Sequence, residues 1–135
     1  MYNINYLAVL ASGVVMMILG YVWYGPLFGK PWMKLIGITK SSMEGKGSEM
    51  AKNYGMMFVS ALVLSYVLAH VLYAFQSDSI GMALQGAFWI WLGFIATTML
   101  SGVIWTKKPL KLYAIEAGYY LVGLGLIGIV LTLWR

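Results

Sequence analysis

Four long apolar blocks fill most of this sequence and limit what it can fold into. The first three contain no Lys, Arg, Asp or Glu, and they cover residues 6–25, 53–77 and 79–106. The fourth, residues 112–134, contains Glu116 as its only charged residue. A helix crosses the bilayer core with about 20 apolar residues, so each block is long enough to span it.

The blocks predict an all-α integral membrane protein, because a helix in a bilayer satisfies its own backbone hydrogen bonds. We expect a single transmembrane domain over residues 1–135, a four-transmembrane-helix bundle with a short inner amphipathic segment after helix 1. The expected spans are about 6–25, 53–75, 82–105 and 112–134. Composition agrees, since 61% of the residues are hydrophobic and 10% are charged, against about 45–50% and about 25% in soluble domains.

The basic residues predict how the chain is oriented. Eight of the nine lie in the first and third connections between blocks, and they are Lys30, Lys34, Lys40, Lys46, Lys52, Lys107, Lys108 and Lys111. These two connections lie on the same side of a four-span protein, and the positive-inside rule places that side in the cytoplasm. We therefore expect a protein of the cell membrane with both termini outside. The net charge of +5 then reflects topology, and no nucleic-acid partner is expected.

The first connection begins with glycines and prolines, which predict that the first helix ends near Tyr24 and the chain turns. Residues 32–36 then form a short amphipathic segment, which we place flat on the inner membrane surface against anionic lipid. Ser48 is expected to cap the second long helix. The residues expected at the inner interface are Trp23, Tyr24, Lys30, Trp32, Lys34, Trp105, Lys107 and Lys108.

Two strings carry a resemblance to a known family. The more specific is Trp23-Tyr-Gly-Pro-Leu-Phe-Gly-Lys-Pro-Trp32, and the second is Phe88-Trp-Ile-Trp-Leu-Gly-Phe-Ile-Ala-Thr-Thr98. With the glycine-rich last block, they make the chain resemble a family of small four-span membrane proteins from bacteria and fungi that is described only as a domain of unknown function. The resemblance implies a four-helix membrane domain and assigns no catalytic or ligand residue. A weak tandem repeat, aligning Gly20 and Trp23 with Gly102 and Trp105, stays open.

Two ionisable residues within the blocks are candidates for function. Glu116 is the only acid there, and residues of this kind are functional candidates by default. It lies near the start of its block, so it can be a structural acid paired with a nearby lysine or a site for a proton or cation. His70, the only histidine, is interpreted as a hydrogen-bonded residue between helices, with a pH-sensitive role as the alternative. A single histidine makes a poor metal site, so no metal is expected.

Small residues predict where helices approach closely. Ala61, Ser65 and Ala69 repeat every four residues in the second block, as do Gly93, Thr97 and Ser101 in the third. Both stripes predict contacts between helices or between subunits, and Thr97 and Ser101 can form hydrogen bonds across them. The alternative is a polar path along Thr97, Thr98 and Ser101. The remaining glycine face consists of Gly123, Gly125 and Gly128, whose spacing matches a dinucleotide motif without the strand and acid that motif requires. Trp89 and Trp91 point to opposite sides of the third span, so one is expected to pack internally while the other faces lipid or a subunit.

No constellation of catalytic residues is apparent, so we expect no enzyme and no cofactor. The first hypothesis is a self-associating, non-enzymatic membrane protein whose homo-oligomer conducts or transports a small solute or ion. The alternative is a structural or accessory protein that binds lipid or a larger membrane complex through its Trp- and Lys-rich inner rim. An enzyme that uses Glu116 or His70 is the least favoured hypothesis.

Overall fold

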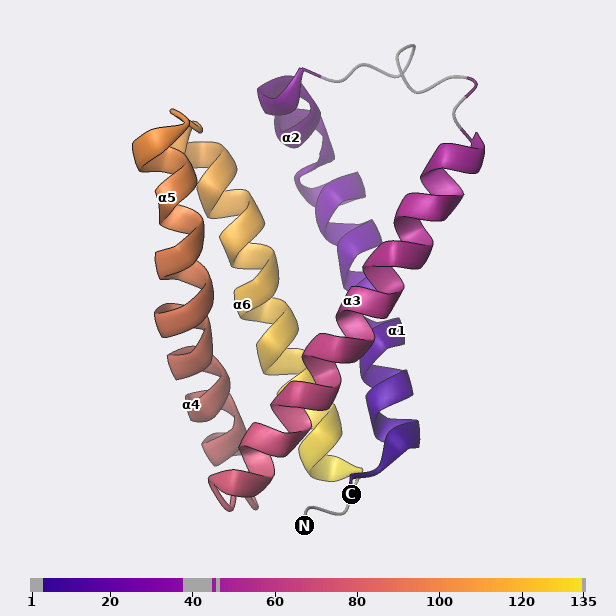
Figure 1. The fold of residues 1–135 in the computed structure, drawn as a ribbon, viewed down its shortest axis with the longest axis vertical. Helices are drawn as coiled ribbons and strands as arrows, with labels where there is room; N and C mark the ends of the chain where they lie inside the picture. Colours follow the sequence, from indigo (N-terminus) through magenta and orange to yellow (C-terminus); the bar gives the residue numbers. More distant parts are fainter. Residues whose placement is uncertain (1–3, 38–44, 46, 135) are drawn as a thin grey trace.

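The computed structural model describes residues 4–37, 45 and 47–134 of the chain (Figure 1). Within that part the chain is helical and has no strand. The elements are α1 (Tyr6–Val22), the π-helical segment η1 (Trp23–Leu27), α2 (Gly29–Ile36), α3 (Gly47–Ala74), α4 (Ile80–Ile90), the π-helical segment η3 (Trp91–Ala96), α5 (Thr97–Trp105) and α6 (Leu110–Leu133).

Four helical stretches of the described chain are long and apolar enough to cross a membrane. They are Tyr6–Leu27, Gly47–Ala74, Ile80–Trp105 and Leu110–Leu133, so α4, η3 and α5 form one continuous span. The predicted all-α bundle with four such helices is confirmed. The second helix begins at Gly47, earlier than the start of its apolar block. Ser48 therefore lies inside α3, and the prediction that it caps this helix is wrong.

The helices are arranged around α6, which contacts α1 on one side and α4, η3 and α5 on the other. α3 packs on α1, crosses it, and leaves the bundle toward its own N-terminal end (Figure 1). Both chain termini lie at one end of the molecule, and α2 lies at the other end together with the α5–α6 connection. The centre is filled by fully buried side chains, which are Ser12, Met16, Ser65, Leu72, Leu124 and Ile127.

The crossing of α1 and α3 is made by small residues. Ala61, Ser65 and Ala69 are buried there, and a Cβ on Gly13 would lie 2.7 Å from Leu62 Cδ2. The Ser65 hydroxyl donates to Ala61 O at 2.8 Å, so its burial leaves no polar atom unsatisfied. The small-residue stripe of the second block thus lies at a close contact between helices.

The first span passes through Pro26 before it ends, contrary to the predicted stop near Tyr24. η1 contains Pro26, and the backbone N–H of Phe28 donates to Trp23 O, five residues earlier, at 2.8 Å. Proline has no N–H to donate four residues back, and the wider π turn moves the pairing past it. The chain then turns at Phe28, where a Cβ on Gly29 would lie 2.7 Å from Tyr24 O.

The amphipathic segment expected after the first span is α2, which starts at Gly29 rather than at Trp32. Its aromatic residues hold it against the end of the first span: the ring centroids of Tyr24 and Trp32 are 4.9 Å apart, and those of Trp23 and Phe28 are 4.8 Å apart. α2 ends at Gly37, whose φ of 75° is in the left-handed region that glycine adopts easily.

Candidate functional site

Glu116 forms an ion pair near the start of α6. Lys108 Nζ lies 3.2 Å from Glu116 Oε1, and 30% and 27% of the two side chains are exposed, so the pair is half-buried. The turn before α6 brings the lysine back to the acid, because Lys107 adopts a φ of 58° and the helix begins at Leu110, directly after Pro109. The predicted pairing of Glu116 with a nearby lysine is therefore present, and the partner is Lys108.

Two tyrosines lie in the electrostatic range of Glu116. Tyr24 and Tyr120 are near enough to interact electrostatically with the Glu116 carboxylate. Tyr119 lies 5.5 Å from Tyr24 and 5.0 Å from Tyr120 between ring centroids, and its hydroxyl donates to Met16 O at 2.9 Å. A partly buried carboxylate attracts a cation through its charge. In this structure Lys108 provides that cation.

Two tryptophans contact the backbone of α6 on either side of Glu116. Trp23 Nε1 donates to Ile115 O at 2.9 Å, and Trp91 Nε1 donates to Ala117 O at 2.7 Å. Trp23 begins η1 and Trp91 begins η3, so the two donors come from the first and third spans. The sequence analysis did not predict these bonds. A signal was present, because both tryptophans start a Trp-x-Gly triplet within the strings that carry the family resemblance.

Trp89 and Trp91 divide as their spacing predicted. Trp91 packs against the core, whereas Trp89 is 64% exposed. Trp105, which the suggested repeat aligns with Trp23, is 81% exposed at the end of α5, and Trp91 is the residue of the third span that donates to α6 as Trp23 does.

His70 lies near the C-terminal end of α3 and Glu116 near the start of α6, and these helix ends lie at opposite ends of the bundle (Figure 1). Its ring meets Tyr66 edge-on with centroids 4.6 Å apart, and Tyr66 in turn stacks on Tyr6. The structure does not bring His70 and Glu116 together. The part of the chain that the structure describes holds no group of three His, Cys, Asp or Glu residues that could bind a metal ion.

The hydroxyl residues of the third span point away from the bundle. Thr97, Thr98 and Ser101 are exposed, and each donates to a carbonyl of its own helical span, Gly93 O at 2.6 Å, Phe94 O at 2.7 Å and Thr98 O at 2.9 Å respectively. A Cβ on Gly93 would meet nothing within 4 Å. Within the described chain this stripe faces no other helix, so the predicted contact through it stays a prediction for a contact between subunits.

The glycines of α6 face two different neighbours. A Cβ on Gly123 would lie 2.6 Å from Met16 Sδ of α1. Added Cβ atoms on Gly125 and Gly128 would lie 3.5 Å from Leu84 and 3.6 Å from Ala83 O, both on α4. The missing side chains thus let α6 approach α1 and α4 together, which agrees with close packing and not with cofactor binding.

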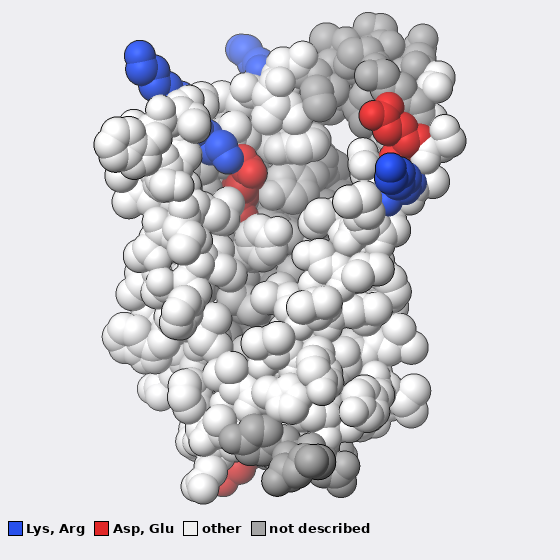
Figure 2. Space-filling model, viewed as in Figure 1, with Lys and Arg blue, Asp and Glu red and all other residues white. Residues whose placement is uncertain are grey.

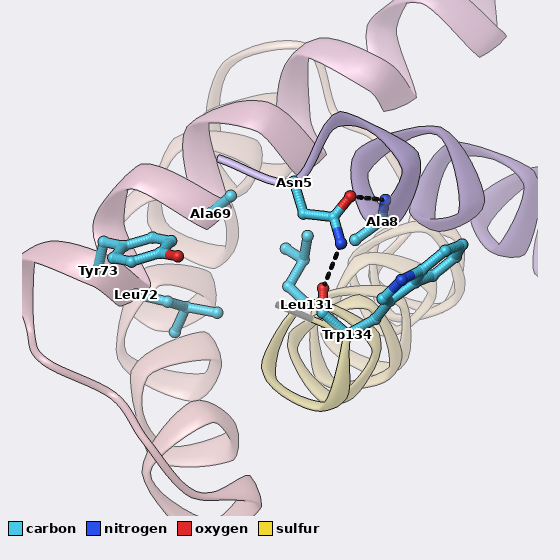
Figure 3. Close-up of a pocket in the computed structure, with 7 residues that line it drawn as sticks. All are labelled: Asn5, Ala8, Ala69, Leu72, Tyr73, Leu131 and Trp134. Carbon is cyan, nitrogen blue, oxygen red and sulfur yellow. Dashed lines mark hydrogen bonds between the residues drawn. The ribbon is translucent and has the colours of Figure 1, made fainter. Parts of the chain in front are cut away.

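The opposite end of the bundle is closed by the two chain ends. Asn5 Oδ1 accepts from Leu7 N and Ala8 N at 3.0 and 3.3 Å, and Asn5 Nδ2 donates to Trp134 O at 3.2 Å (Figure 3). The cavity shown there has a volume of about 10 Å³, room for about one water molecule. Its seven lining residues are labelled in Figure 3.

The charged side chains lie mostly at the other end. Figure 2 shows the described Lys residues gathered at the end away from the termini, where the visible face is also hollowed between α3 and the α5–α6 hairpin. The predicted interface residues Trp23, Tyr24, Lys30, Trp32, Lys34, Trp105, Lys107 and Lys108 all belong to the segments at this end. Lys40 and Lys46 lie outside the described residues.

Comparison with known proteins identifies the family. The sequence model described as "Protein of unknown function (DUF1761)" matches residues 7–132, so the chain belongs to this family. No curated protein and no protein of solved structure matches the chain. The resemblance inferred from the two strings is confirmed at the level of the family.

Proposed function

We propose that this member of the DUF1761 family is a non-enzymatic membrane protein that self-associates and lets a small cation pass along a path containing Glu116. The observation that carries the proposal is the half-buried Lys108–Glu116 pair beside Tyr24 and Tyr120. Ionisable residues within spanning segments are expensive and mark ion or proton paths. Lys108 occupies the carboxylate now, and a mobile cation competes with it for the same oxygens.

A path through one chain is not supported, because the bundle centre is packed. Met16, Leu72, Leu124 and Ile127 are each no more than 2% exposed. A shared path between subunits needs an outward-facing polar surface, and the third span offers one in Thr97, Thr98 and Ser101. This span is also the least buried of the four: 11% of its most apolar stretch is buried inside the molecule, against 44% for the corresponding stretch of α6. We therefore propose that the α5 face meets another copy of the chain.

The lysines support an orientation in the cell membrane. Those described lie at the end away from the termini, and positive residues are concentrated on the cytoplasmic side of membrane proteins. We propose that this end faces the cytoplasm and that both termini lie outside. Glu116 is then reached from the cytoplasmic end, while the end closed by Asn5 and Trp134 faces outward.

The test is cation uptake into proteoliposomes that contain the purified protein, with Na⁺, K⁺ and H⁺ offered separately. For Glu116→Gln we expect uptake to fall about tenfold, which corresponds to about 1.4 kcal/mol of lost cation binding. Glu49→Gln is the matched control, since this acid lies in the first turn of α3 and is exposed. Uptake by the native protein no greater than by empty liposomes, or equal uptake by Glu116→Gln, would contradict the proposal.

A second candidate function, an accessory protein bound to lipid or a larger membrane complex, is favoured by α2. Lys30 and Lys34 are exposed, while the Trp32 ring is held against Tyr24, so the segment presents two charges from a fixed support. The test is co-purification in mild detergent with Lys30, Lys34 and Trp32 replaced together. A larger complex that is lost in this variant and kept in Lys111→Met would favour the accessory role.

A further inference from the structure

We propose that Trp23 and Trp91 are positioning residues for Glu116, whose two indole N–H groups hold the backbone on either side of it and so fix the depth and rotation of its carboxylate. The inference rests on the proposed function in one respect, that Glu116 is the site. The two hydrogen bonds from Trp23 and Trp91 to α6, called the clamp below, can be tested without measuring transport.

The two bonds are accepted by backbone carbonyls two residues apart in α6. Trp23 Nε1 donates to Ile115 O and Trp91 Nε1 to Ala117 O, at 2.9 and 2.7 Å. Residues two apart in an α-helix are separated by about 200° around its axis, so the donors approach α6 from opposite sides. Glu116 lies about 100° from each of these positions. Its side chain therefore emerges in the gap between the two contacts, which agrees with its partial exposure of 27%.

The local backbone of both donors is unusual in the same way. Trp23 is the first residue of η1 and Trp91 the first of η3, and well under 1% of residues in proteins are π-helical. Such turns occur frequently at functional sites, where the extra residue changes the direction of the side chains that follow. Two of them, each starting with Trp-x-Gly and each donating to α6 beside Glu116, are unlike ordinary helix packing.

The surroundings of the clamp are adapted to it. A Cβ on Gly118 would lie 3.2 Å from Trp23 Cζ2, so the glycine gives the indole ring room against α6. Tyr113 OH donates to Ala96 O, the last residue of η3, at 2.7 Å and satisfies a carbonyl at the end of the wide turn. Polar contacts thus connect α6 to both π-helical segments over its first three turns. Hydrogen bonds across helices at this depth set rotation more than apolar contacts, which tolerate sliding.

A structural role alone predicts a different result from a positioning role. If the tryptophans only stabilise the bundle, Trp→Phe lowers the unfolding temperature and leaves the folded site unchanged. If they position Glu116, the same change alters how its carboxylate is presented in the folded protein. Phenylalanine keeps most of the ring packing and removes the N–H donor. The exposed Trp89 and Trp105 supply matched controls on the same chain.

The experiment measures the rate at which dicyclohexylcarbodiimide, an apolar carboxyl reagent, modifies Glu116 in the full-length protein in lipid vesicles, read by mass spectrometry of the peptide. Trp23→Phe, Trp91→Phe and the double variant are compared with Trp89→Phe and Trp105→Phe. We expect the rate in the double variant to change about threefold or more, as when a hydrogen bond of ordinary strength no longer selects one orientation. The control variants should react at the native rate.

A native modification rate at Glu116 in a folded double variant would overturn the proposal, whatever its unfolding temperature. If the double variant does not fold, the two single variants decide it: a changed rate in either one supports the clamp, and native rates in both overturn it. The outcome is independent of cation uptake. A changed rate in a protein whose uptake does not depend on Glu116 would keep the clamp and remove the proposed function.

Discussion

The contribution of the Lys108–Glu116 pair can be predicted from its geometry. At the 3.2 Å that separates Lys108 Nζ from Glu116 Oε1, two unit charges attract by about 1.3 kcal/mol in bulk water and about 5 kcal/mol at an effective dielectric constant of about 20. About 30% of each side chain is exposed, and measured pairs of this kind cluster toward the aqueous limit because solvent screens them. We therefore expect a coupling free energy of about 1 kcal/mol.

A double-mutant cycle measures this value. The native protein, Lys108→Met, Glu116→Gln and the double variant are unfolded with SDS in mixed micelles, and helix content is followed by circular dichroism. The coupling is the part of the double variant's free-energy change that the single variants do not account for. Lys111→Met combined with Glu116→Gln is the matched control, because Lys111 is an exposed lysine on α6 whose coupling should be near zero.

The result also separates the two interpretations of Glu116. A coupling of about 1 kcal/mol means that a cation can displace Lys108 at a small cost, as the proposed path requires. A coupling below about 0.2 kcal/mol, the lower end of exposed pairs, would mean that the pair is not formed in the membrane protein and would refute this reasoning. A value above about 3 kcal/mol would indicate a fully buried structural pair, which a passing cation could not open easily.

Changes at four further positions are predicted, and the same unfolding titration measures each of them. Asn5→Ala should lower the free energy of unfolding by about 1–2 kcal/mol, because it removes both the helix cap and the bond to Trp134 O. Asn5→Asp should lower it less, because the carboxylate keeps the cap and only the bond to Trp134 O is lost. Equal losses in the two variants would contradict the link between the chain ends. Ser65→Leu should lose about 1–3 kcal/mol through overpacking, and a neutral result would place α3 elsewhere. Lys107→Gly should be neutral or stabilising by up to about 1 kcal/mol, because φ is 58° there, and a clear loss would contradict that turn. Thr97→Val should change the free energy of unfolding of the monomer by less than about 0.5 kcal/mol. The same variant should shift the oligomer distribution in native mass spectra toward monomer. An unchanged distribution would exclude Thr97 from a subunit contact.

The spans were predictable because one energetic term dominates them. Burying charge in hydrocarbon is so unfavourable that long blocks with no more than one charged residue mark the four helices reliably. Helix ends follow a different rule. α3 continues back to Gly47 through residues outside its apolar block, where helix propensity and the first-turn Glu49 favour the helix and hydropathy gives no signal. The path of the chain through Pro26 was also missed, since the π turn depends on contacts that no local pattern contains.

The site could be predicted only in part. Proximity in sequence correctly predicted that a lysine of the third connection pairs with Glu116. The short connection keeps its lysine side chains close to Glu116, and few other acids are near enough to pair with them. The small-residue stripes show where this approach fails. Ala61, Ser65 and Ala69 look in sequence like Gly93, Thr97 and Ser101, yet the first set is buried against α1 and the second faces outward. Spacing defines a face, and only the arrangement of all four helices decides what covers it.

The central place of α6 links the packing to the site. Its glycines let α1 and α4 approach it from two sides, and the tryptophans that follow on those same spans then reach the carbonyls beside Glu116. Among the described residues, no side-chain hydrogen bond joins the first half of α3 to α6: residues 51–57 are all exposed, and the helix leaves the bundle there. The end that holds the ion pair is therefore built from a fixed side, made of α6 and its two clamping spans, and a sparsely packed side, made of α3. Few buried contacts therefore oppose a displacement of α3 at that end, whereas Glu116 belongs to the fixed side.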